Sequence, residues 1–181
     1  MTLPRLFGIP GALRAGSYNR LLLAEARRLF GPADYDEADL RLPLYDGDLE
    51  QAEGIPASVQ RLADGIVAAD AVVIATPEYN RGPSGVLKNA LDWISRTKGR
   101  PFRDKPLAII SAADGRGGGD RSQYALRLML VAFRPHLLQG PEVLVPEAAH
   151  AFDAGGRLVH EAQSKALEEL MAALRAAGER R

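Results

Sequence analysis

The sequence predicts an α/β fold in which a five-stranded parallel sheet is covered by helices on both faces. Short apolar runs alternate along the chain with segments of helical periodicity, and this alternation is typical of parallel sheets. Two of the runs, 71–75 and 107–110, are apolar without interruption, as expected of strands that are buried on both faces. No repeat or linker divides the chain, so we expect one domain spanning residues 1–181.

The predicted elements follow one another in regular order. Strands are expected at 6–9, 35–42, 71–75, 107–110 and 142–145. Helices are expected at 19–30, 56–67, 86–94, 122–133 and 161–177. The strand at 35–42 is acidic and therefore suits an edge of the sheet, whereas glycine, proline and aspartate predict a loop at 43–56.

Helical spacing is clearest after Pro56, where the apolar residues share one face: Val59, Leu62, Ala63, Ile66 and Val67. The next predicted helix repeats this pattern. On its polar side, Lys88 and Asp92 are spaced to form an i,i+4 ion pair.

Composition excludes several classes of function. The formal net charge is zero, which gives no electrostatic reason to expect nucleic acid or a membrane as a partner. No apolar run approaches the roughly 20 residues of a membrane span. The absence of cysteine excludes disulfides, thiolate metal sites and a cysteine nucleophile, and we expect a cytoplasmic protein. The three histidines have no metal-ligand spacing, so no metal site is expected.

The loop at 11–20 combines small residues with Arg14, Ser17 and Asn19, ahead of a predicted helix. Free amides at a helix N-terminus together with an arginine favour a phosphate site, although Ser17 and Asn19 are equally typical of helix caps. Neither GxxxxGK[ST] nor GxGxxG is present. A mononucleotide site is therefore expected in preference to a P-loop or a dinucleotide-binding domain.

The loop after residues 71–75 is bracketed by Pro77 and Pro83, which suit a strand end and the first turn of a helix. Between them lie residues without an apolar pattern: Glu78, Tyr79, Asn80 and Arg81. The three asparagines of the chain all fall in the 11–20 loop or in this loop and its following helix, which favours a site over ordinary turns.

A third loop, SAADGRGGGD, contains Ser111 and a run of glycines beginning at Gly115. A glycine run alone indicates flexibility as readily as binding. Its place beside the other two loops, at the edge where parallel strands end, favours binding.

These motifs resemble those of the NADPH-dependent FMN reductase family. GALRAGSYNRLL resembles the flavin-phosphate loop GSLRxxSxNRxL, and PEYNRGPSGVLKNALDWISR resembles the signature PEYNxSxPGxLKNAIDWxSR. PLYDGDLE and GGGDRSQYALR are similar to segments of the bacterial chromate and quinone reductases in this family. The similarity extends from the first predicted strand to the last.

The resemblance implies a flavodoxin-like three-layer sandwich with strand order 2-1-3-4-5, non-covalent FMN, and homodimers or homotetramers. It assigns the FMN phosphate to Arg14, Ser17, Tyr18 and Asn19. It places Pro77, Glu78, Tyr79 and Asn80 along the isoalloxazine ring, and Ser111 with the glycines from Gly115 at the other polar edge.

The implied activity is hydride transfer from NADPH or NADH through FMN to a quinone or another small acceptor such as chromate, an azo compound or a nitro compound. The flavin supplies this chemistry, so no catalytic side chain is expected. Arg81 and Arg116 are candidates to attract the anionic donor or an oxyanion acceptor, unless they are ordinary surface arginines.

Two departures from the family pattern bear on function. Ala12 replaces a serine that would donate to the phosphate, and Arg81-Gly82 replaces a pair beside the ring. A flavin-free binding protein and a flavodoxin-like electron carrier without its own small-molecule acceptor are the alternatives. Such carriers are usually strongly acidic, whereas this chain is neutral.

Overall fold

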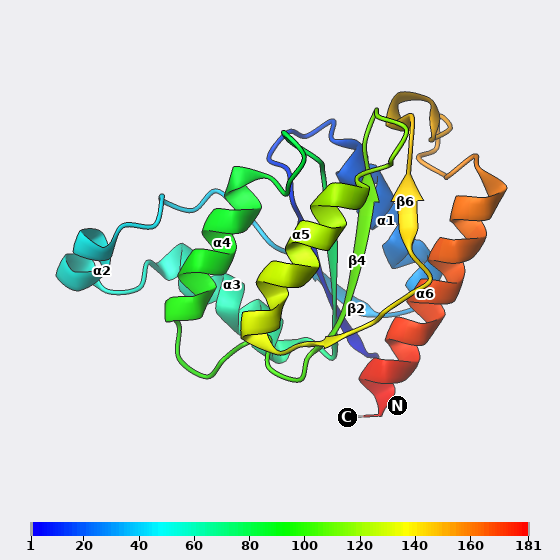
Figure 1. Ribbon diagram of the computed structural model, residues 1–181. Helices are drawn as coiled ribbons and strands as arrows, with labels where there is room; N and C mark the ends of the chain where they lie inside the picture. The colour runs from blue at the N-terminus through cyan, green and yellow to red at the C-terminus, as the bar shows by residue number, and fades with distance from the viewer. Residues whose placement is uncertain (1, 181) are drawn as a thin grey trace.

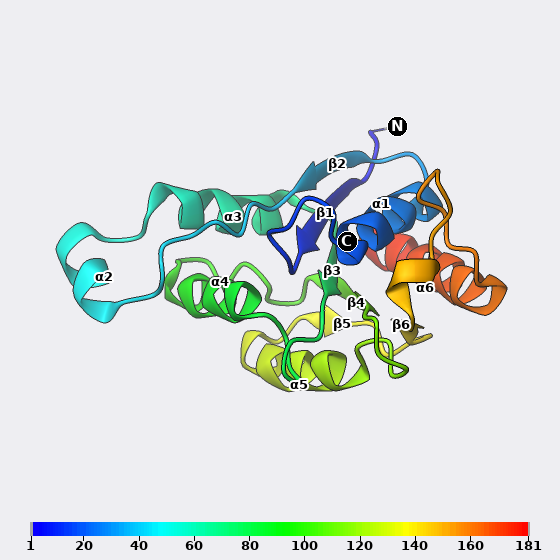
Figure 2. The same cartoon turned by 90° about the horizontal axis from the view of Figure 1, so that it is seen from above.

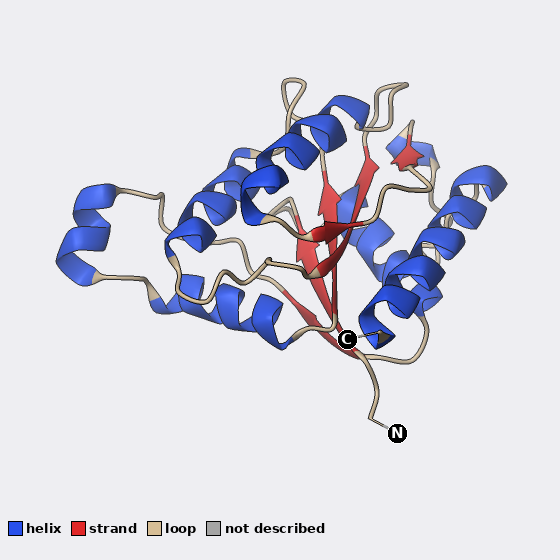
Figure 3. Cartoon of the chain, turned by 60° about the horizontal axis from the view of Figure 1, so that its bottom comes forward, coloured by secondary structure: helices blue, strands red, loops and turns tan. Residues whose placement is uncertain are grey.

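The computed structural model describes residues 2–180, so the two end residues of the predicted domain lie outside the described part. All strands belong to one parallel sheet (Figure 3): β1 Arg5–Pro10, β2 Asp34–Glu37, β3 Ala71–Thr76, β4 Pro106–Ala112, β5 His136–Leu137 and β6 Val143–Val145. The order β2-β1-β3-β4-β5 confirms the predicted flavodoxin-like arrangement, with β6 as an additional strand beside β4.

The α-helices of the described chain are α1 Tyr18–Phe30, α2 Gly47–Glu53, α3 Ala57–Ala68, α4 Gly85–Arg96, α5 Asp120–Leu130 and α6 Glu161–Glu179, and all except α2 form the two outer layers. Seen from above, α1 and α6 cover one face of the sheet, and α3, α4 and α5 cover the other (Figure 2). No helix among residues 2–180 is long and apolar enough to cross a membrane.

The core lies on both sides of the two central strands, since every residue of β3 and β4 is buried. The periodicity after Pro56 is confirmed for Val59, Leu62 and Ile66, which are buried in α3. It is wrong for Val67, which is 56% exposed because it lies at the margin of the apolar stripe. The expected ion pair of α4 is present, with 2.6 Å between Nζ of Lys88 and Oδ1 of Asp92.

The last part of the sheet differs from the prediction of one strand at 142–145. β5 pairs with the beginning of β4, where Pro106 faces His136, and β6 pairs with its end, where Ile110 faces Val143. A break at Gly140-Pro141 separates β5 from β6. β5 was missed because two residues cannot display a strand period.

The segment 35–42 is also shorter as a strand than predicted. β2 ends at Glu37, and after Ala38 donates to the carbonyl of Gly8 the chain leaves the sheet. It then forms an arm, residues 43–56, that extends beyond the sheet (Figure 1).

The prediction of a loop at 43–56 is wrong in part, because the arm contains α2. This helix begins after Asp46, whose carboxylate accepts from the amide of Asp48, and none of its residues is buried. Without a buried face it has no apolar period, so the sequence pattern did not reveal it.

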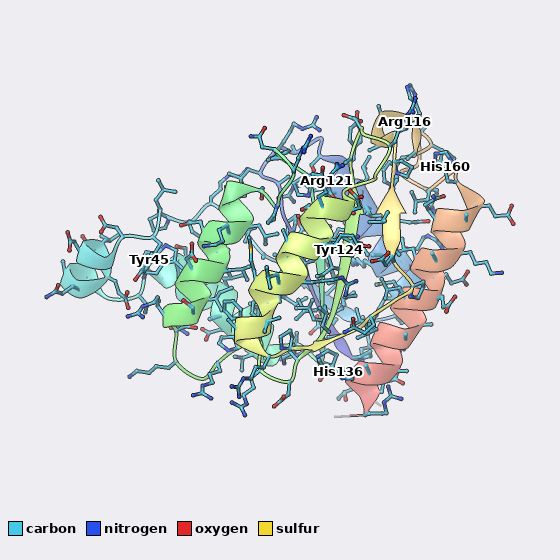
Figure 4. The ribbon with its side chains drawn as sticks, viewed as in Figure 1. Tyr45, Arg116, Arg121, Tyr124, His136 and His160 are labelled. Atoms are coloured by element: carbon cyan, nitrogen blue, oxygen red, sulfur yellow. The ribbon has the colours of Figure 1, made fainter. Side chains whose placement is uncertain are left out.

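Contacts with α4 hold the arm in place. The side chains of Asn89 and Trp93 each donate to the carbonyl of Pro43 at 2.9 Å, and the Tyr45 ring packs edge-on against Trp93. Tyr45 lies between α2 and α4 in Figure 4. The Tyr45 hydroxyl donates to Glu50, which raises the pKa of Tyr45.

Candidate cofactor site

The loops that follow β1, β3 and β4 meet at the carboxyl edge of the sheet, at the top of Figure 1. They enclose a cavity of about 510 Å³. Its lining includes predicted site residues from all three loops: Arg14, Ser17, Tyr18, Asn19, Pro77, Glu78, Tyr79 and Gly115. The other predicted residues, Asn80, Arg81 and Ser111, do not line it.

The first loop leads from β1 into α1 and presents free donors. The backbone amides of residues 12–16 donate no hydrogen bond to any residue of the described chain. Arg14 is exposed beside them, and its Cζ lies 5.5 Å from the centroid of the Tyr18 ring. Unbonded amides, a helix N-terminus and a guanidinium together suit an anion such as phosphate.

Neighbouring elements fix the course of this loop. A Cβ at Gly11 would lie 2.8 Å from the carbonyl oxygen of Ala75, so only glycine permits this approach to the end of β3. Ser84 donates to the carbonyl of Gly11 and also accepts from the amide of Leu87 at the start of α4. Because Ser84 caps α4, Pro83 precedes the helix and does not occupy its first turn as predicted.

Ser17 is the N-cap of α1, because its hydroxyl accepts from the amide of Asn19 at 3.3 Å. The cap leaves the Ser17 hydroxyl proton free to donate into the cavity. Ala12, the departure from the family pattern, is 2% exposed and does not line the cavity.

Asn19 connects the first loop to the third. Its side-chain amide donates to the carbonyl of Ala112 at 2.8 Å, and its oxygen accepts from the Ala112 amide at 3.0 Å. The side chain is almost fully buried. Asn19 therefore positions the end of β4 beside α1, while remaining at the wall of the cavity.

The second loop ends in a tight turn over residues 79–82. The amide of Tyr79 donates to the carbonyl of Gly82 at 2.9 Å, and the reverse bond is 3.1 Å long. Asn80 and Arg81 both have left-handed backbones, with φ of 49° and 65°, as in a type I′ turn. Turn geometry thus accounts for Asn80 and directs it, with Arg81, toward solvent.

Glu78 joins this loop to α5, whose N-cap residue, Gly119, has no side chain to cap the helix. The carboxylate of Glu78 accepts from the amide of Ser122 at 3.3 Å and lies 3.7 Å from the guanidinium of Arg121. A carboxylate at the α5 N-terminus is stabilised by the helix dipole. Behind it, the hydroxyl of Ser122 donates to the carbonyl of Pro77.

In the third loop Ser111 is buried inside the fold. Its hydroxyl donates to the carbonyl of Gly118 at 2.6 Å and accepts from the side-chain Nε2 of Gln123 at 2.9 Å. Gly118 has φ of 58°, and a Cβ there would lie 2.8 Å from the backbone of Leu144. Ser111 therefore supports the loop from beneath, whereas Gly115 is at the surface of the cavity.

Charged side chains of both signs surround the opening. The arginines at 116 and 121 lie at this end of the molecule (Figure 4), opposed by Asp114 and Asp120. All four residues line the cavity; Arg116 was predicted to be near the site, but Arg121, Asp114 and Asp120 were not. Their position in or directly after the third loop was the one feature of the sequence that could have predicted them as site residues.

Comparison with known proteins shows which protein family this chain resembles. The sequence profile described as NADPH-dependent FMN reductase matches residues 4–150. The chain is 45% identical over 172 residues to an NAD(P)H-dependent FMN reductase of Pseudomonas aeruginosa, covering 94% of this chain and 92% of that one. It is 42% identical over 138 residues to the quinone reductase of Escherichia coli K12, covering 74% of this chain and 73% of that one.

Among solved structures, the chain is similar to the flavoenzyme NAD(P)H:(acceptor) oxidoreductase of Paracoccus denitrificans. The TM-score is 0.87 at 32% identity, and 98% of each chain is covered. The match in sequence spans the three loops of the cavity, and the match in structure spans the whole sheet. The chain belongs to the NADPH-dependent FMN reductase family.

Proposed function

We propose that this chain is an FMN-dependent NAD(P)H oxidoreductase that reduces quinones or other small electron acceptors. One observation carries the proposal: a cavity at the carboxyl edge of a parallel sheet, with unbonded amides and Arg14 at the start of α1. The names of the relatives from Pseudomonas and Escherichia support it.

The described residues fit FMN as a non-covalent cofactor. The cavity volume of about 510 Å³ falls within the range of roughly 300–1,000 Å³ that is usual for small-molecule sites. The amide and guanidinium of Arg14 and the hydroxyl of Ser17, which all belong to residues that line the cavity, would hold the phosphate. Pro77 and Tyr79 would flank the ring, and the backbone near Gly115 would face its polar edge.

When bound, FMN supplies the redox chemistry, accepting a hydride from NADPH or NADH and passing electrons to the acceptor. The protein contributes binding, orientation and charge. The exposed arginines at 116 and 121 would attract the phosphates of the nicotinamide donor. The carboxylate of Glu78 is engaged with Ser122 and Arg121, so it holds the loop in position and is not needed as a proton donor.

Quinones are the acceptor class that we favour, because two groups of relatives carry that name, in Escherichia coli and in plants. Chromate, azo and nitro compounds are acceptors of the same open site. A flavodoxin-like electron carrier is the second candidate, but such carriers are usually strongly acidic, whereas this chain has a formal net charge of zero.

A titration of flavin-free protein tests the assignment of the phosphate. FMN is expected to bind at least tenfold more tightly than riboflavin, which lacks the phosphate, as measured by quenching of flavin fluorescence. Loaded protein is then expected to oxidise NADPH when benzoquinone is the only acceptor. Equal affinity for FMN and riboflavin would contradict a phosphate-binding site at the start of α1. NADPH oxidation only in the presence of a protein partner would favour the electron-carrier function.

We also propose that the chain self-associates through α5 with a second copy. Tyr124 and Leu128 of α5 are 57% and 75% exposed, and their i, i+4 spacing places them on one face; Val131, directly after the helix, is 69% exposed. Tyr124 lies on the outer side of α5 in Figure 4. Leu128→Glu is expected to shift the mass measured by light scattering toward the monomer, and an unchanged mass would contradict this interface.

A cytoplasmic location stays a prediction of the same proposal, since NADPH and NADH are cytoplasmic electron donors. Fractionation of cells that express the chain would test it, with activity expected in the cytoplasmic fraction.

A further inference from the structure

A second cavity lies at the opposite edge of the sheet from the candidate cofactor site. It has a volume of about 340 Å³ and is bounded by the end of α4, by the loop at 97–105 and by residues 132–134 after α5. The loop between α4 and β4 is at the bottom of Figure 1, whereas the cofactor loops are at the top. A ligand in this second cavity would therefore not contact the flavin of the same chain.

The residues that line this cavity include both arginines and aromatic side chains. Arg100, Arg103 and Arg134 line it, together with Phe102 and Phe133, whose rings pack edge-on with centroids 5.7 Å apart. The chain as a whole has no net charge, so these three arginines form a local group of cations on a neutral protein.

The cations of the cavity are poorly neutralised by the protein itself. Arg103 lies 3.6 Å from the carboxylate of Asp104. Within the described chain, the side chains of Arg100 and Arg134 form neither an ion pair nor a hydrogen bond. Three exposed arginines therefore line one small cavity, and an anion bound there would gain charge-assisted hydrogen bonds from them.

The backbone at two of these arginines is unfavourable for any side chain. Arg100 has φ of 50° and Arg134 has φ of 54°, in the left-handed region that glycine adopts without strain. Asp104, beside them, has φ of 57°. Such outliers persist where the surrounding structure imposes them, and they cluster at binding sites.

Backbone hydrogen bonds hold the arginines together. The amide of Arg103 donates to the carbonyl of Arg100 at 2.9 Å, which closes a turn, and the amide of Asp104 donates to the carbonyl of Arg134 at 2.9 Å. The two segments that carry the cations are thus joined directly. The site is organised before any ligand arrives, which reduces the entropy lost on binding.

We infer that this cavity binds a small organic anion, with a phosphate or carboxylate group on an apolar body. Guanidinium groups pair with phosphate and carboxylate in a fixed fork geometry, which suits the rim of the cavity. The Phe102 and Phe133 floor suits the apolar body. This inference does not depend on the proposed reductase activity.

Calorimetric titration of the FMN-saturated protein with 2-naphthyl phosphate tests the site directly. Saturation with FMN occupies the other cavity. Binding in the micromolar to millimolar range is expected, and 2-naphthol, which lacks the charge, is expected to bind at least tenfold more weakly. Titration with 2-naphthoate identifies which anionic group the site prefers.

The decisive variant is the double substitution Arg100→Gly with Arg134→Gly. It removes two guanidiniums while giving both positions the residue that their φ angles favour, so the melting temperature is not expected to fall. Affinity for 2-naphthyl phosphate is expected to drop at least tenfold. Arg157→Ala with Lys165→Ala, two exposed cations outside the cavity, removes the same charge and is expected to leave binding unchanged.

Arg103→Ala is a second test, at a position whose backbone is not left-handed, and it is expected to weaken binding of 2-naphthyl phosphate at least threefold. If the double glycine variant is unstable, Arg103→Ala tests whether the arginines of the cavity bind the anion. The inference is overturned if 2-naphthyl phosphate does not bind, if it binds the cavity variants as tightly as the parent protein, or if the control variant loses as much affinity.

Discussion

Replacement of Asn19 by alanine separates the structural role of this residue from a role in flavin binding. The side chain makes two buried hydrogen bonds with Ala112, at 2.8 and 3.0 Å. Losing both and stranding the Ala112 backbone is expected to lower the free energy of unfolding by about 2–4 kcal/mol. For a chain of this size, that corresponds to a decrease in melting temperature of roughly 5–15 °C.

The assay is thermal unfolding of flavin-free protein, with Arg14→Ala as the matched control. Arg14 lines the same cavity but is exposed, so its removal is expected to change the stability of the flavin-free form by less than about 0.5 kcal/mol. Loss of a charge-assisted bond to the phosphate, about 1.5–3 kcal/mol, would weaken FMN binding roughly 10- to 100-fold.

Asn19→Ala should therefore lower the stability of the flavin-free protein, whereas Arg14→Ala should weaken FMN binding. A flavin-free Asn19→Ala protein that melts with the parent would refute the structural role derived from the Ala112 contacts. Unchanged FMN affinity in Arg14→Ala would refute the assignment of the phosphate to the α1 end of the cavity.

Three further outcomes are expected. Arg81→Gly should stabilise the flavin-free protein by about 0.5–1 kcal/mol, because glycine relieves the left-handed backbone; a lower melting temperature would contradict the turn geometry. Ser111→Ala should cost about 1–3 kcal/mol and speed hydrogen exchange at residues 115–119, and unaltered exchange would argue against support from beneath. Burial, reinforced by Glu37, raises the pKa of Tyr35. The folded chain thus keeps a proton that the unfolded chain releases above pH about 10, and stability should fall above that pH, less so in Tyr35→Phe; identical pH profiles would contradict this.

The central sheet was predictable because its strands carry strong signals. The continuous apolar runs at 71–75 and 107–110 became β3 and β4, whose residues are all buried. The parts that were missed have weak local patterns. α2 buries no residue and depends on Asn89 and Trp93, which follow it by about 40 residues in the sequence, and β5 is a two-residue strand that only its pairing with β4 defines.

At the site, the sequence indicated which loops meet but not which side chains face inward. Ser111 and Asn80 were expected to contact the flavin, yet one is buried beneath Gly118 and the other lies in an exposed turn. A hydroxyl or an amide supports a loop as readily as it binds a ligand, and only the fold decides between the two. Asn19 and Glu78 illustrate the same point, since each lines the cavity while also joining two elements.

Anaerobic mixing of the FMN-loaded protein with NADPH, followed by addition of a quinone, tests the proposed function most directly. We expect the visible flavin absorbance to bleach on mixing and to return when the quinone is added, with no other protein present. Flavin that stays oxidised in the presence of NADPH and NADH, or that quinone fails to reoxidise, would contradict it.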